Sequence, residues 1–149
     1  MNLSVEGMDK VISQIISISD DKIKRGEILK ILRRQAKPIL AAIKANTPVA
    51  DKPIVGRNGK IYEPENLKKS MAIKTSPLKH YPNVLVGPRK GQKAVRDGFY
   101  AFFIQEGVYG IPKNDFIMDA ARPLLNSTEK TMSVQLEKYI DKKIQQTKL

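Results

Sequence analysis

Two long segments of the chain repeat apolar residues at the three- and four-residue spacing of an amphipathic helix. The first follows Asp20 and Asp21, whose side chains can cap a helix. Its apolar face would carry Ile28, Leu32, Ala36, Ile39 and Ile43. The second segment repeats every fourth residue at Met132, Leu136, Ile140 and Ile144. A terminal helix this long, with a narrow apolar stripe, must dock along a sheet or along another subunit.

Proline and aspartate mark where these helices should begin and end. The first long helix is expected to stop at Asn46-Thr47-Pro48, because the residue before a proline disfavours helical backbone. Asp115 is expected to cap a second helical start, and Pro38 and Pro123 to kink or restart their helices. A further short helix is predicted over 7–18.

Strand patterns occupy the middle of the chain. Residues 70–76 alternate in the period-two pattern of a half-buried strand, and residues 83–88 form a short β-branched run. The most apolar run, 99–105, is expected to be the third and central strand. Prolines and glycines at the joints favour an antiparallel meander. The predicted fold is α+β: a small antiparallel sheet of three to four strands, packed by a long helix of the N-terminal half and a long C-terminal helix.

Length and composition indicate a single domain, 1–149, without a membrane span. The chain has 149 residues and no cysteine, so it has no disulfide framework, which suits a reducing cytosol. No window of about 20 apolar residues occurs, and no signal-peptide pattern is present, so no membrane association is expected. Residues 48–65, rich in proline and glycine, are expected to form a flexible loop or hairpin that turns at Arg57-Asn58-Gly59-Lys60.

The charge balance is strongly basic. Lys and Arg number 27 against 15 Asp and Glu, a net charge of +12. The candidate basic patch comprises Lys30, Arg33, Arg34, Lys37, Arg89, Lys90, Lys93 and Arg96. Such a patch can bind nucleic acid or an acidic protein, or it can be a solvated surface that keeps the protein in solution.

Catalytic patterns are missing from the sequence. His80 stands alone in a loop, and no serine elbow or phosphate-binding glycine loop occurs. Glu106, Asp115 and Asp119 could converge on a hard metal ion, but their spacing matches no calcium loop. We therefore predict no enzyme, and no catalytic, cofactor or metal site.

The order of motifs resembles the head–tail joining family, the neck or tail-completion proteins of long-tailed phages and prophages. The likeness rests on Gly7 before the first helix, on Asn46-Thr47-Pro48-Val49, on the segment 66–74 and on Val84–Gly87. The family's signature is matched by Tyr100, Ala101, Phe103, Glu106, Gly107, Phe116 and Ala121. The chain departs from the family pattern at Asn66, Val108 and Asp115, where the family usually has Gly, Thr and Pro.

The resemblance implies a non-enzymatic virion component, made in the bacterial host cytoplasm, that forms a homo-oligomeric ring, often a hexamer, between the phage connector and the tail. Gly107 would then permit a reversal of the backbone, and Phe116 would return the chain to the core. The intervening residues Val108, Tyr109 and Ile111, together with 48–65, are the candidate subunit contacts. The alternative function is a basic DNA- or RNA-binding module without catalytic activity, whose binding would weaken steeply with salt.

Overall fold

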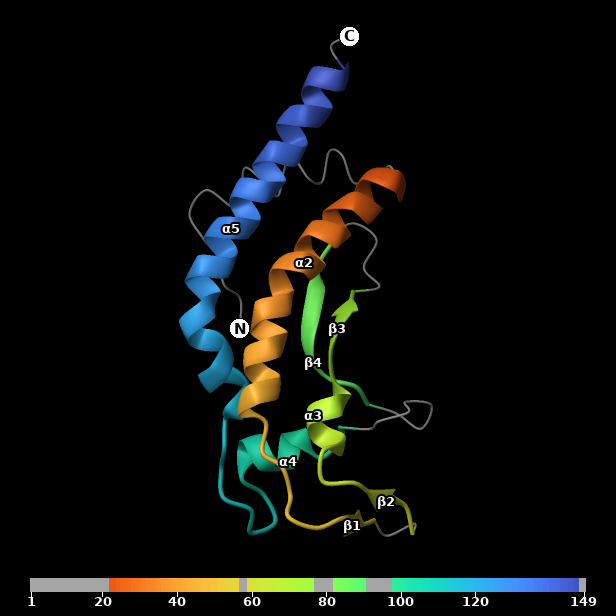
Figure 1. The fold of residues 1–149 in the computed structure, drawn as a ribbon, viewed down its shortest axis with the longest axis vertical. Helices are drawn as coiled ribbons and strands as arrows, with labels where there is room; N and C mark the ends of the chain where they lie inside the picture. Colours follow the sequence, from red (N-terminus) through yellow and green to blue (C-terminus); the bar gives the residue numbers. More distant parts are fainter. Residues whose placement is uncertain (1–21, 57–58, 77–81, 91–97, 148–149) are drawn as a thin grey trace. The chain divides into compact units, whose positions relative to one another are not determined.

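The structure is a computed structural model, and it describes residues 22–56, 59–76, 82–90 and 98–147. The elements follow one another as α2 (Lys22–Asn46), β1 (Ile54–Val55), β2 (Ile61–Tyr62), α3 (Asn66–Ser70), β3 (Met71–Thr75), β4 (Val84–Pro88), α4 (Ala101–Glu106) and α5 (Phe116–Thr147) (Figure 1). The α+β class is therefore confirmed. The helix predicted over 7–18, the caps Asp20 and Asp21, and His80 lie outside the described residues.

The predicted sheet of three to four strands is wrong. The described strands form two separate antiparallel sheets of two strands each, β1 with β2 and β3 with β4. In the first sheet Ile54 lies opposite Tyr62, and Val55 lies opposite Ile61. The strands β3 and β4 match the segments predicted from the alternating and β-branched patterns. The error lies in the third predicted strand, 99–105.

That apolar run forms the short helix α4. Ala101 is buried and Ile104 packs against the same core three residues later, whereas Phe102 between them is exposed. This spacing is helical, because residues three apart share one side of a helix. Gly107 then ends α4 in the left-handed conformation, at φ 67°. The N–H groups of Gly107 and Val108 both donate to the Phe103 carbonyl, at 3.1 and 3.2 Å, which is a glycine-terminated helix end.

Both long helices are confirmed, and neither restarts at its proline. α2 ends at Asn46, as the sequence predicts, and runs through Pro38; α5 runs through Pro123. Both prolines are exposed, so water can replace the N–H that each removes from its helix. Asp115 stands just before α5 and accepts the Asp119 N–H on its backbone carbonyl at 3.0 Å, the position predicted for a cap.

The chain divides into two compact units, each with its own apolar cluster. The first unit comprises Met1–Ala36, Thr75–Leu85 and Asn126–Leu149, and the second comprises Lys37–Lys74 and Val86–Leu125. In the first unit, Ile28, Leu136 and Ile140 are buried together. In the second unit, the buried cluster contains Ile39, Ile43, Leu67, Met71, Ala101, Phe116 and Ala121.

Candidate functional site

An apolar pocket of about 390 Å³ opens in the second unit, and we call it the second-unit pocket. Its wall contains residues of 48–50, of the β1–β2 hairpin, of α3 and of the start of α4. The lining residues are Pro48, Val49, Ala50, Ile54, Gly56, Tyr62, Glu63, Pro64, Leu67, Phe99, Tyr100, Ile104 and Ile111. The pocket thus brings together the two segments predicted as subunit contacts, 48–65 and Val108–Pro112.

Three aromatic rings form one wall of this pocket. The rings of Tyr62, Phe99 and Tyr100 contact one another in tilted or edge-to-face geometry, with centroids 5.7 to 5.9 Å apart. The Tyr100 hydroxyl pairs with the side-chain amide of Asn66, whose Nδ2 donates to it at 3.2 Å. Edge-to-face contacts and a partner for the buried end of a tyrosine hold such rings in fixed positions. The aromatic wall is therefore pre-formed.

The β1–β2 hairpin, which provides Tyr62 of the aromatic wall, forms a further part of the rim with Ile54 and Gly56. Its turn is closed by two backbone hydrogen bonds, from Gly56 to the Lys60 carbonyl at 2.8 Å and from Gly59 to the Gly56 carbonyl at 2.9 Å. The hairpin predicted for 48–65 is therefore present, and Gly59 has a positive φ of 75° at its turn. Ile54 lines the pocket yet is 53% exposed, while Val55, its neighbour in β1, is exposed without lining the pocket. A two-stranded hairpin is marginal in isolation, so this rim depends on what packs against it.

The loop Val108–Pro112, which we call the Tyr109 loop, displays an aromatic side chain in solvent. Tyr109 is 86% exposed and has a positive φ of 56°, a conformation that costs a non-glycine residue about 1–2 kcal/mol. Its ring stands 5.3 Å from that of Phe103, centroid to centroid, in edge geometry. The turn closes from the Ile111 N–H to the Val108 carbonyl at 3.2 Å. An exposed aromatic residue held in a strained backbone conformation makes this loop a candidate contact site.

The residues that match the head–tail joining signature lie in the second unit, mostly in its core, in its aromatic contacts or at the end of α4. Ala101, Phe116 and Ala121 are buried in its core. Tyr100 and Phe103 take part in the aromatic contacts. A Cβ at Gly107 would lie 2.7 Å from the Lys113 backbone nitrogen, so glycine is needed there for space as well as for conformation. Glu106 is the exposed last residue of α4.

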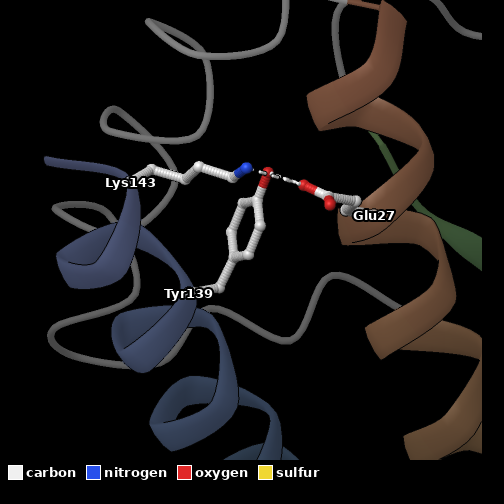
Figure 2. Close-up of polar contacts among 3 residues, drawn as sticks. All are labelled: Glu27, Tyr139 and Lys143. Carbon is white, nitrogen blue, oxygen red and sulfur yellow. Dashed lines mark hydrogen bonds and ion pairs between the residues drawn. The ribbon is translucent and has the colours of Figure 1, made fainter. Parts of the chain in front are cut away.

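A polar cluster in the first unit joins α2 to α5 (Figure 2). Tyr139 Oη donates to Glu27 Oε2 at 2.6 Å, and Lys143 Nζ lies 3.4 Å from the same oxygen. The hydrogen bond from Tyr139, followed by the charges of Lys143 and Lys30, lowers the pKa of Glu27 below its ordinary value. The only carboxylate of α2 is thereby turned toward α5.

The predicted basic patch is divided between the units. Lys30, Arg33 and Arg34 are exposed on α2 in the first unit, whereas Lys37, Arg89 and Lys90 are exposed in the second. Lys93 and Arg96 lie outside the described residues.

Sequence analysis includes Ile54 and Tyr62 in the candidate contact segment 48–65 without singling them out, and it places Phe99 in a strand and not beside a pocket. The signal that could have identified the pocket is the presence of both prolines and apolar residues in 48–64. Such a composition predicts a loop when the residues that pack against it are not known. Within the described ranges, no three His, Cys, Asp or Glu side chains gather as metal ligands. Over the same ranges, no helix has the length and hydropathy to cross a bilayer.

The chain was compared with protein-family models, with curated proteins and with solved structures, and none of the three comparisons finds a match.

Proposed function

We propose that the chain is a structural virion component, a tail-completion or head–tail joining protein that assembles as a ring in the phage neck between connector and tail. It would be made in the host cytoplasm and incorporated into the virion. The resemblance of the signature residues motivates the family. The core and helix-end positions of Ala101, Gly107, Phe116 and Ala121 support a structural rather than a catalytic reason for that signature.

The observation that carries the proposal is the presence of a pocket and an exposed aromatic residue on the same unit. The second-unit pocket has about 390 Å³ and an almost entirely apolar lining, in the range of pockets that hold organic groups. Tyr109 is the most exposed of the large apolar or aromatic side chains in the described part of the chain. Aromatic side chains seated in apolar pockets are the usual anchors of protein interfaces.

A head-to-tail contact follows if Tyr109 of one copy enters the second-unit pocket of the next. Such a contact joins two different surfaces of the same protein, so each added copy leaves one pocket and one Tyr109 loop open. Repeating this contact closes a ring when the rotation that relates neighbouring copies is a whole-number fraction of a full turn. A hexamer of this 16.8 kDa chain would have a mass of about 100 kDa.

Light scattering coupled to size-exclusion chromatography, over a concentration series, tests the contact. Wild-type protein should form discrete oligomers, and Tyr109→Asp and Ile54→Asp should each shift it to monomer, because each places a charge in an apolar interface. Phe102→Asp and Val55→Asp are the matched controls: both side chains are exposed, and neither lines the pocket. Oligomers that survive both test variants would contradict the contact.

Mixing the two test variants distinguishes a head-to-tail contact from nonspecific association. The Tyr109→Asp chain keeps its pocket, and the Ile54→Asp chain keeps its Tyr109. A mixture should therefore form heterodimers and nothing larger, since the remaining pocket and loop are both disabled. Full oligomers in the mixture, or no association at all, would count against the arrangement.

The assignment to the virion neck has its own test. We expect the gene to be flanked by portal, capsid and tail-tube genes, and the purified chain to bind connector or tail proteins. If the neighbouring genes encode no virion proteins and the purified chain binds no connector or tail protein, the assignment to the virion neck is wrong. The chain would then be a self-assembling protein of another kind.

A further inference from the structure

We infer that the turn of α2 that carries Lys30, Arg33 and Arg34 binds the backbone phosphates of duplex DNA. This inference is independent of assembly through the second-unit pocket, because all three residues belong to the first unit. We call these three residues the α2 basic turn.

The acidic residues that the structure describes offset the positive charge of the α2 basic turn only in part. All three side chains are exposed, and neither Arg33 nor Arg34 has an ion-pair partner among the residues that the structure describes. Glu27, the sole carboxylate in the sequence of α2, is held by Tyr139 Oη at 2.6 Å and Lys143 Nζ at 3.4 Å (Figure 2). Glu27 also attracts the charge of Lys30, so the cations of the α2 basic turn without an acidic partner in the described part of the chain are Arg33 and Arg34.

The spacing of the cations suits a phosphate backbone. Lys30 and Arg34 are four residue steps apart, which is about 6 Å along a helix. Duplex DNA presents one negative charge per about 1.7 Å of its axis, so each cation can reach its own phosphate. The two neighbouring guanidinium groups can each donate two hydrogen bonds to a phosphate, which lysine cannot do in a fixed geometry.

The surroundings of the α2 basic turn favour duplex DNA over an acidic protein or a single strand. The adjacent Ile31 and Leu32 are half-buried against the apolar cluster of the first unit, so they are not displayed beside the cations. A protein interface normally has an apolar or aromatic centre. Binding of single strands normally uses aromatic side chains for base stacking, and α2 contains no aromatic residue. A cationic surface without an apolar centre is therefore better suited to the regularly charged backbone of duplex DNA.

Fluorescence anisotropy with a labelled 20-base-pair duplex of random sequence tests the inference on the full chain. With three phosphates contacted, the affinity should fall about 40-fold between 50 and 200 mM KCl, a logarithmic slope of about −2.7. Arg33→Gln/Arg34→Gln should weaken binding at 50 mM at least 10-fold and reduce the slope by about 2. The effect should persist in a Tyr109→Asp background, which separates it from assembly.

The matched control is Lys138→Gln/Lys142→Gln, which removes the same charge from exposed α5 residues of the same unit that stand beside Glu137 and Asp141. It should leave the affinity within about twofold. Equal weakening by both double variants would overturn the site, because it would show a response to net charge alone. Absence of binding at 50 mM would also overturn it. Displacement of the duplex by poly-L-glutamate at equal charge concentration would also overturn the inference, because it would show that the ligand is an acidic polypeptide.

Discussion

The two units of the molecule differ in how they use their apolar residues. In the described part of the first unit, Ile28, Leu136 and Ile140 are buried together, and a polar contact from Tyr139 to Glu27 joins the helices beside them. The second unit buries a larger cluster, leaves the pocket-lining Ile54, Phe99 and Ile111 substantially exposed, and also exposes Tyr109. The described part of the first unit exposes Leu85, Val134 and Ile144 as well, so exposure alone does not separate the units; in the second unit the exposed side chains accompany an apolar pocket. We expect the second unit to provide the contacts of the proposed assembly, and the first unit the proposed contact with DNA.

The largest effect should come from emptying the core of the second unit. Phe116 is fully buried, and Phe116→Ala should lower the free energy of unfolding by about 3–5 kcal/mol, since it removes a ring and leaves a cavity. Ile28→Ala is the counterpart in the first unit, and should cost about 2–4 kcal/mol because the side chain is smaller.

Hydrogen exchange read by mass spectrometry would sharpen this comparison. Phe116→Ala should increase exchange chiefly in 37–74 and 86–125, and Ile28→Ala chiefly in the first unit. Uniform increases over the whole chain in both variants would show that the two units unfold together as one cooperative body.

A smaller effect is expected where α4 ends. Gly107→Ala should cost about 2–3 kcal/mol in chemical denaturation, because it combines a left-handed backbone with a Cβ that would lie 2.7 Å from the Lys113 nitrogen. Gly110→Ala is the matched control: its φ is 75°, and nothing lies within 4 Å of its added Cβ. The control should cost about 1 kcal/mol. Equal costs would show that the close approach of Lys113 relaxes freely.

The smallest effect should be the pH response of the first unit. Because the Tyr139 hydrogen bond lowers the pKa of Glu27, the contribution of this carboxylate to stability is present above its ordinary value of 4.5. It is lost as the pH falls below 4.5 through the lowered pKa of the folded state. Tyr139→Phe removes the main cause of the lowered pKa. The melting temperature of this variant should therefore decrease less between pH 5 and pH 3 than that of the wild type. A pH profile identical to that of the wild type would show that the contact adds nothing to stability.

Periodicity predicted the long helices, and it failed where a run was short and apolar throughout. Ile28, Ala36 and Ile43 are buried as the stripe of α2 requires, and Leu136 and Ile140 do the same for α5. Ile144, the last residue of the predicted stripe, is 42% exposed, since the described part of its unit offers it little to pack against. The prediction of a strand over 99–105 is wrong because its six consecutive apolar residues fit the helical and the strand period equally well. Gly107 was the overlooked signal, since glycine directly after such a run is a common helix terminator.

The candidate site was predictable only in part. Val108–Pro112 and 48–65 were each predictable as contact segments from apolar residues beside proline and glycine. Their meeting at one pocket depends on Ile54, Tyr62, Phe99 and Ile111, which are far apart in the sequence and are brought together only by the folding of the second unit. No local pattern encodes that proximity.

The central claim is that Tyr109 of one copy occupies the second-unit pocket of another, and cysteine cross-linking tests it directly. The chain has no cysteine, so the only thiols in a mixture are those introduced by Val108→Cys, which keeps the Tyr109 ring, and by Val49→Cys in the pocket lining. On oxidation we predict a disulfide between the two different chains, and none when Val108→Cys is mixed with Glu137→Cys, whose position does not line the pocket. Equal cross-linking to both partners, or none to Val49→Cys in a sample that is oligomeric by light scattering, would contradict the account.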